Sequence, residues 1–183
     1  MKDRDRRAWN SSLRPVSLKK QGVPKKKPLP LSEVRRRFDI GVAAALGDAP
    51  TRSDAMKLAD SAFSKYIRLR DARKDGWLDC FICHEPLHWT EAHMMHFMSR
   101  SSSSTRFDEM QHAGCATCNG KPLGDRSAYA SRIDAKYGDG MAHKLYCKSK
   151  RTVHLSTGDL LTVADRYSAM VEEERINNPE KFR

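Results

Sequence analysis

The sequence predicts an α+β fold in which a short, irregular module held together by cysteines is flanked by amphipathic helices and preceded by a flexible basic arm. Three observations predict it: two paired cysteine motifs, apolar residues at helical spacing on both sides of them, and positive charge concentrated near the N-terminus. The chain has 183 residues, 39% of them hydrophobic and 31% charged, and a net charge of +11. This length suits one domain with a modest core. No apolar run is long enough for a membrane span or a secretory signal, so we expect no membrane association.

Residues 1–50 are expected to form the flexible arm, and residues 51–183 the folded domain. Residues 1–37 contain thirteen lysines and arginines against three acids, a net charge of +10. Four prolines would interrupt a helix in the first thirty residues: Pro15, Pro24, Pro28 and Pro30. A short helix over 31–47 is compatible with the sequence. An arm of this charge favours contact with nucleic acid, and a solvated leader that promotes solubility is the alternative.

Amphipathic helices are expected on both sides of the central module. Over residues 54–74, apolar side chains recur at steps of three and four from Ala55 to Ile67, and Ser53 is placed to cap the helix. The module itself, over 76–114, should be hairpin-like, with a strand ending near Met98 and a polar loop over 101–105. A helix beginning near 118 or just after 122 should end at about 137, and further helices are expected over 141–147 and 159–176.

The two C-x-x-C motifs are the strongest chemical signal. Cys80 and Cys83 form one motif, Cys115 and Cys118 form the other, and 31 residues separate them. A chain without a secretory signal favours metal binding over disulfides. Four thiolates are a preferred ligand set of structural Zn²⁺, so we predict that these four cysteines bind it. A dithiol redox role is the weaker alternative, and Cys147 is assigned no role.

Five of the seven histidines lie within 29 residues around these motifs: His84, His88, His93, His96 and His112. Because four cysteines complete a zinc site, the histidines remain available, and Asn119 directly follows the last cysteine. Such a cluster is compatible with a second divalent ion and a proton acceptor, the parts that phosphodiester hydrolysis needs. Taken singly, each histidine is more simply interpreted as a structural or surface residue.

As a set, these motifs resemble the NinG/Rap family of phage recombination nucleases, within the zinc-stapled HNH (ββα-metal) superfamily to which endonuclease VII also belongs. The matching stretches are AFSKYIRLRDA (62–72), HMMHFMSR (93–100), TRFDEM (105–110), CATCNG (115–120) and AYASRIDAKYG (128–138). The resemblance covers about two thirds of the chain and excludes the first fifty residues. It implies a small HNH-like core and metal-dependent cleavage of branched DNA, including Holliday junctions and D-loops.

The resemblance also implies roles for single residues. His96 matches the general base at the end of a strand, and Asn119 matches a metal ligand at the start of a helix. His93 stands where the family usually has an acid that binds the metal. The expected catalytic set is therefore His93, His96 and Asn119, with His93 and Asn119 holding Mg²⁺ or Mn²⁺; imidazole suits Mn²⁺ better. Four residues have open roles: Glu91 or Asp108 as the missing carboxylate, Gln111 or His112 as the group that orients the base.

Contacts to DNA are expected to involve mainly the phosphate backbone. The candidate residues are Arg100, Arg106, Lys121, Lys25, Lys26 and Lys27. Symmetric cleavage of a four-way junction requires two active sites, which is compatible with a homodimer, and a phage-encoded chain would act in the host cytoplasm. Two alternatives stay open: a non-catalytic zinc module that binds nucleic acid, and an adaptor whose arm docks on an acidic protein.

Overall fold

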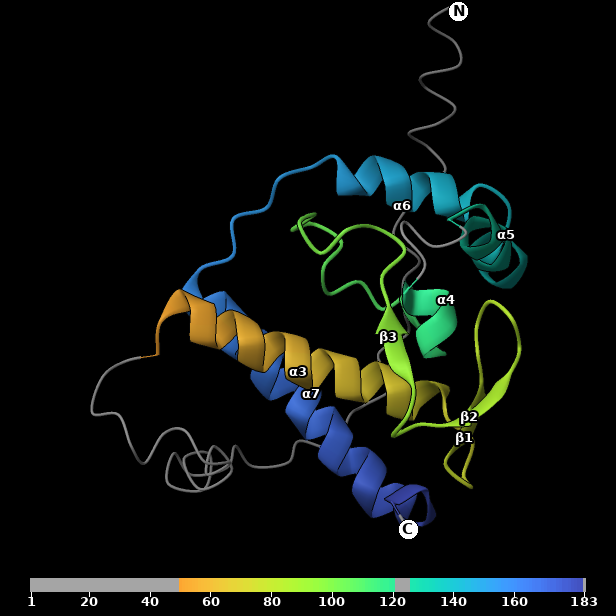
Figure 1. Cartoon of the computed structure of the whole chain (residues 1–183). Coiled ribbons are helices and arrows are strands. Elements are labelled where there is room, and N and C mark those ends of the chain that lie inside the picture. The colour runs from red at the N-terminus through yellow and green to blue at the C-terminus, as the bar shows by residue number, and fades with distance from the viewer. Residues whose placement is uncertain (1–49, 121–125, 183) are drawn as a thin grey trace, which may run out of the picture. The chain divides into compact units, whose positions relative to one another are not determined.

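The computed structural model describes residues 50–120 and 126–182 (Figure 1). The predictions for the arm, for the helix over 31–47 and for Lys25, Lys26, Lys27 and Lys121 fall outside these residues. The described chain combines helices with two small antiparallel sheets, in agreement with the α+β class. Within the described chain, no helix is both long and apolar enough to span a membrane.

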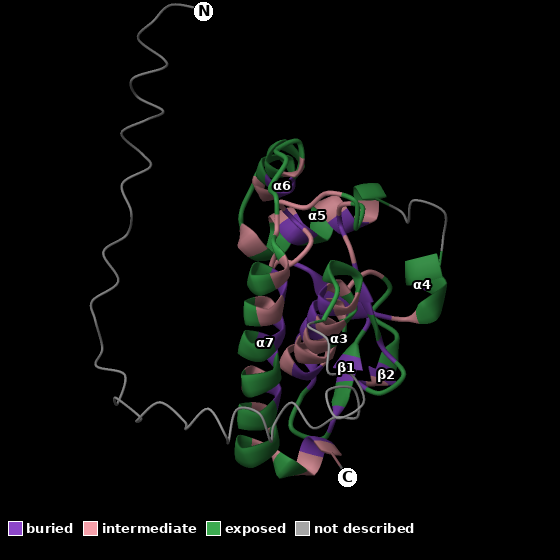
Figure 2. Ribbon diagram, turned by 90° about the vertical axis from the view of Figure 1, so that its left-hand side faces the viewer, coloured by how far each residue is buried: buried purple, intermediate pink, exposed green. Residues whose placement is uncertain are grey.

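Two long helices, α3 (Arg52–Asp71) and α7 (Thr157–Asn177), lie side by side (Figure 1). They run in the same direction: Arg52 Nε donates to the Leu155 carbonyl at 3.1 Å near their starts, and Lys181 Nζ donates to the Leu69 carbonyl at 2.9 Å near their ends. The buried positions fall at helical spacing, as predicted: Ala55, Ala59, Phe63 and Ile67 on α3, and Leu160, Ala164, Tyr167 and Val171 on α7. The opposite side of α7 is largely exposed (Figure 2).

The caps of these helices differ in part from expectation. Thr51, not Ser53, caps α3, because its Oγ1 accepts from the Asp54 amide at 3.3 Å and donates to the Asp54 carboxylate at 2.6 Å. The helix stops at Asp71 rather than 74, since Ala72 is extended and packs into the core. A reciprocal capping box of Ser156 and Asp159 starts α7 two residues before the predicted position.

The central module contains two short hairpins. Strand β1 (Trp77–Asp79) pairs with β2 (Pro86–His88), and β3 (His93–Met95) pairs with β4 (His112–Gly114), with Met94 opposite Ala113. Strand β3 therefore ends three residues before the predicted Met98, because its partner β4 offers only three residues for pairing. The predicted polar loop follows as a series of turns.

Short helices complete the fold: α4 (Ala116–Gly120), α5 (Arg126–Tyr137), α6 (Met141–Ser149) and the 3-10 turn η1 (Pro179–Phe182). Helix α4 begins at Ala116, two residues before the earlier of the two predicted starts, and α5 ends at Tyr137 as predicted. Gly138 and Gly140 separate α5 from α6 with φ angles of 101° and 78°, values that L side chains avoid. Helix α6 continues two residues beyond the predicted 147.

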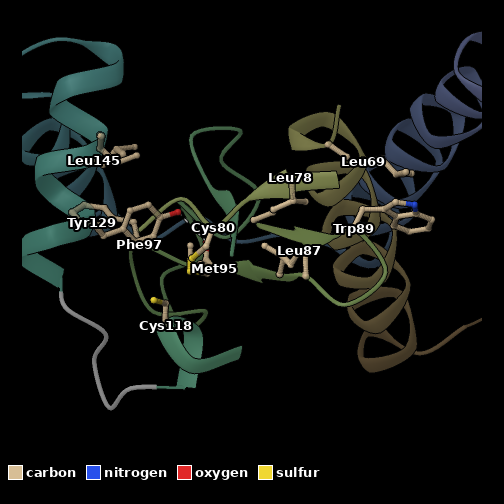
Figure 3. Packing of buried hydrophobic residues seen from close by; sticks show 14 of the residues in the cluster. Leu69, Leu78, Cys80, Leu87, Trp89, Met95, Phe97, Cys118, Tyr129 and Leu145 are labelled. Atoms are coloured by element: carbon tan, nitrogen blue, oxygen red, sulfur yellow. Dashed lines mark hydrogen bonds between the residues drawn. The ribbon is translucent and has the colours of Figure 1, made fainter. Parts of the chain in front are cut away.

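The main core cluster joins these parts through the cysteine region (Figure 3). Leu69, Leu78, Leu87 and Trp89 lie on one side; Cys80, Met95 and Cys118 lie in the middle; Phe97, Tyr129 and Leu145 lie towards α5 and α6. The two halves of this core thus meet at the cysteines. The spacing between the cysteine side chains therefore affects how the two halves pack against each other.

Candidate metal centre and the adjacent histidines

The four cysteines predicted to bind zinc come together. The sulfur atoms of Cys80, Cys83, Cys115 and Cys118 all lie within 4.8 Å of one another. Cys83 and Cys115 Sγ are 3.8 Å apart. With Zn–S bonds of about 2.3 Å, a tetrahedral shell places its sulfurs about 3.8 Å apart. None of the four forms a disulfide. The donor set and its spacing fit a metal, and the cluster could hold a structural zinc ion.

Local turns deliver the first pair. Cys80 follows β1, its amide donates to the Glu85 carbonyl at 2.8 Å, and its carbonyl accepts from the His84 amide at 2.9 Å. His84 closes this turn with a φ of 61°. The predicted surface role of His84 agrees with its exposure. The short turn brings both sulfurs of the motif to the same side.

The second pair is carried by β4 and α4. Cys115 follows Gly114, and the Cys118 amide lies 3.4 Å from the Cys115 sulfur. The Phe81 amide donates to the Ala113 carbonyl at 3.1 Å, which ties the two cysteine motifs together. Gly114 permits this approach: an added Cβ would lie 2.4 Å from Met95 Cε and 3.0 Å from Cys80 Sγ. Any side chain at position 114 would therefore push against the metal centre.

The thiols of this centre differ in acidity. Burial opposes ionisation of Cys80, but hydrogen bonds from the Cys83 and Cys115 amides outweigh it and lower the pKa to about 7. Burial and the neighbouring thiols raise the pKa of Cys118 to about 12. Metal binding requires thiolates. A bound dication would supply the positive charge that stabilises the thiolate of a cysteine with a raised pKa, such as Cys118.

The three residues predicted to be catalytic all belong to one unit, formed by β3, β4 and the following α4. His93 is exposed at the start of β3, opposite Gly114. His96 directly follows β3, and Asn119 is exposed on α4, which packs against β3. The backbone amide of Asn119 donates to the Cys115 carbonyl at 3.0 Å. The helix that carries Asn119 therefore also carries Cys118 of the cysteine cluster.

His96 is half-buried in a positive environment. Burial first, and then the charges of Arg100 and Arg106, lower its pKa to about 4, against the opposing charge of Asp60. Its Nδ1 atom is buried and has no hydrogen-bond partner among the described residues. The ring is therefore neutral near pH 7 and has the lone pair that a proton acceptor needs.

The two arginines predicted to contact phosphate have different surroundings. Arg106 Nε donates to Asp60 Oδ1 at 2.9 Å, and its Nη1 donates to the Arg100 carbonyl at 2.6 Å. This side chain thus fastens the loop after His96 to α3. Arg100 itself is exposed.

The residues with open roles lie as follows. Glu91 is exposed, whereas Asp108 accepts from Lys148 Nζ at 2.6 Å. Buried Gln111 donates to the Thr105 and Arg106 carbonyls at 2.7 and 2.9 Å. In the described chain, neither Gln111 nor His112 hydrogen-bonds to His96, so neither orients it directly.

Sequence reasoning assigned no role to Asp71, which forms a buried network with His112. Asp71 Oδ2 lies 3.0 Å from His112 Nδ1 and accepts from the Ala113 amide at 2.9 Å. His112 Nε2 lies 2.9 Å from the Tyr137 hydroxyl, and Phe81 stacks on the ring at 3.9 Å. Burial lowers the pKa of His112 although Asp71 opposes the shift. The one signal in the sequence that could have pointed to Asp71 is its place in the stretch AFSKYIRLRDA (62–72), which resembles the family.

Helices around two small hairpins, with a four-cysteine cluster at their junction, define a small mixed protein with a candidate structural metal centre. Residues 45–176 match the family model described as NinG, Bacteriophage Lambda NinG protein. The match spans more than half of the chain, and the chain belongs to this family. Comparison with curated proteins and with solved structures yields no match.

Proposed function

We propose that this chain is a metal-dependent endonuclease that hydrolyses phosphodiester bonds in branched DNA recombination intermediates such as Holliday junctions and D-loops. The observation that supports the proposal is the β3–β4–α4 unit: His93 begins β3, His96 directly follows β3, and Asn119 lies on α4 directly after Cys118 of the cysteine cluster. Two antiparallel strands followed by a helix are the element order of an HNH-like core. Family membership adds support through its link to phage recombination.

Two metal ions have separate tasks in this proposal. Zn²⁺ at the four cysteines fixes the unit and takes no part in the reaction. His93 and Asn119 would hold Mg²⁺ or Mn²⁺, which supplies positive charge to the scissile phosphate and the departing oxygen. The imidazole of His93, in place of an acid, favours Mn²⁺.

The residues of the chain would then activate water. Neutral His96 takes a proton from a water molecule, whose oxygen forms a bond to phosphorus. The bond from phosphorus to one bridging oxygen breaks, and that oxygen leaves with a proton from solvent. Cationic residues hold the DNA through its backbone and not through its bases.

The test is cleavage of an end-labelled four-way junction by the full chain with Mg²⁺ or Mn²⁺. We expect metal-dependent nicking, faster with Mn²⁺, which His96→Ala reduces by at least about 100-fold. His154→Ala is the matched control, because His154 is exposed and outside the unit. Binding of the junction without nicking under any of these conditions would refute the endonuclease and favour a non-catalytic nucleic-acid-binding zinc protein.

A further inference from the structure

A cationic surface on α6 lies outside the candidate site. No acidic residue occurs between positions 140 and 158, a segment that contains four cations. They are Lys144, Lys148, Lys150 and Arg151, called here the α6 surface. Ala142 and Leu145 bury the opposite side of the helix. Lys144 and Lys148 are four residues apart on α6 and therefore share one side, and Lys150 and Arg151 directly follow the helix.

Most of this charge has no acidic partner. Lys148 pairs with Asp108 at 2.6 Å, whereas Lys144, Lys150 and Arg151 form no ion pair within residues 50–120 and 126–182. Lys150 Nζ lies 4.5 Å from the ring centroid of Tyr146, which is 43% exposed. Unneutralised cations beside an exposed aromatic ring are suited to a polyanion.

Exposed cations on the α3–α7 pair are different. Lys57 pairs with Asp54, Arg166 with Glu109, and Arg175 with Glu172. The outer side of α7 also exposes the acids Asp165, Glu172 and Glu173. The α6 surface is thus suited to an anion, whereas the outer side of α7 would repel one.

Consecutive serines attach the α6 surface to the loop that leaves the candidate site. Ser102 Oγ donates to the Ser149 carbonyl and Ser104 Oγ donates to the Lys148 carbonyl, both at 2.7 Å. Ser103 Oγ accepts from the Val153 amide at 2.9 Å. Leu145 of α6 also lines a small cavity with Phe97 and Met98, just after His96. The end of α6 is therefore held by the segment that begins next to His96.

We propose that the α6 surface is a binding site for the DNA phosphate backbone, which positions one duplex arm of the substrate of the proposed nuclease. The four cations lie within the eight residues 144–151, so they are close enough together to contact neighbouring phosphates of one DNA strand. The contact needs no base reading, in accordance with recognition of branched shape. It rests on the proposed function only for the identity of the DNA.

The experiment compares two triple variants of the full chain that lose equal charge. Lys144→Gln/Lys150→Gln/Arg151→Gln removes the cations of the α6 surface that lack acidic partners. Lys57→Gln/Arg166→Gln/Arg175→Gln removes three ion-paired cations elsewhere. Affinity for a fluorescent duplex and a four-way junction is measured by anisotropy from 50 to 200 mM salt, with Ca²⁺ in place of Mg²⁺ or Mn²⁺. Thermal melting checks that both variants are folded.

We expect the α6 triple to lose at least about tenfold in affinity at 0.1 M salt and to lower the salt slope by roughly 2 to 3. The control triple should keep the wild-type slope. Equal weakening by both triples, or unchanged affinity of the α6 triple, would overturn the proposal; the latter would favour an acidic protein partner. If wild type binds but never cleaves while the α6 triple loses binding, this inference stands and the nuclease falls. If the wild type cleaves and the α6 triple binds normally, the proposed nuclease function stands and the proposed role of the α6 surface is wrong.

Discussion

Asp71, the last residue of α3, accepts hydrogen bonds from its neighbour Arg70 and from two groups of β4, far away in the sequence. Its carboxylate contacts Arg70 Nη2 at 2.7 Å, His112 Nδ1 at 3.0 Å and the Ala113 amide at 2.9 Å. Burial alone would raise its pKa, but the hydrogen bond from His112 and the charge of Arg70 outweigh burial and lower it. One side chain thus joins α3 to β4, immediately before the second cysteine motif.

Removing this carboxylate should be costly. Asp71→Ala leaves His112 Nδ1 and the Ala113 amide without their acceptor, while Arg70 keeps its bond to the Gln111 carbonyl, so we expect a loss of roughly 3 kcal/mol in the free energy of unfolding. Asp75→Ala is the control, because Asp75 is exposed, pairs with Arg73 at the long distance of 3.8 Å and accepts one hydrogen bond from the Trp77 amide. It should cost about 1 kcal/mol or less. Urea unfolding measures both. Equal, small losses would show that the network does not stabilise the fold.

His96 predicts a pH dependence of stability. Its folded pKa is lowered to about 4, whereas an unfolded histidine titrates near 6.5. Between these values the unfolded state binds a proton that the folded state does not, so stability falls as the pH drops through this window. When the pH is lowered from 6.5 to 5, the wild type should lose up to about 2 kcal/mol more stability than His96→Gln. Solvent screening of the half-buried ring makes the difference smaller than this upper bound. Urea unfolding at both pH values tests this, and equal losses would contradict it.

At the scale of elements, the serine-rich loop and α6 depend on each other. Because Ser102 and Ser104 donate to the last carbonyls of α6, the loop satisfies acceptors that the helix itself leaves open. A run of serines in a sequence is ordinarily interpreted as a solvated loop. Here two of three consecutive hydroxyls bind α6, and the third binds Val153 in the segment that follows it.

The double change Ser102→Ala/Ser104→Ala should therefore loosen the end of α6. Two lost hydrogen bonds should reduce stability by about 2 kcal/mol and increase amide exchange over residues 145–151. Ser101→Ala is the matched control, because among the described residues the side chain of Ser101 bonds only to nearby Ser99. Unchanged exchange in α6 for the double variant would mean that the loop does not hold the helix.

The elements that could be predicted from the sequence are those whose signal is local. Helices α3, α5, α6 and α7 follow from apolar spacing and glycine stops, and the cysteine cluster follows from motif spacing alone. Helix α4 has five residues, too few for a periodic pattern. The contact of Asp71 with His112 joins positions 41 apart, and no local pattern reports such a pair. The roles of His93, His96 and Asn119 stay predictions.

At the scale of the whole molecule, the cysteine centre lies between two halves of the core. Cys80 and Cys118 pack with Leu78 and Leu87 on one side and with Tyr129 and Leu145 on the other (Figure 3). Without a metal, four thiols at this junction repel when ionised and leave the halves without a fixed spacing.

Metal removal should therefore destabilise the entire fold and not only the turns around the cysteines. We expect a strong chelator, or Cys118→Ser, to lower the melting temperature by about 10 °C or more, with loss of one equivalent of zinc measured by mass spectrometry. Cys147→Ser should change neither value, since Cys147 is exposed and apart from the cluster. A metal-free protein with the same melting temperature as the wild type would exclude a structural metal.

The pairing of α3 with α7 has a consequence for synthesis in the cell. The contacts at the two ends of this pair link positions 103 and 112 residues apart. In a nascent chain that has exposed α3 and the whole cysteine module, Met94 and Phe107 can already pack against Phe63. The α3 stripe still lacks its contacts with Leu160 and Tyr167 until α7 leaves the ribosome. Completion of this domain must then await the synthesis of α7, and during that interval α3 is the natural target for a chaperone.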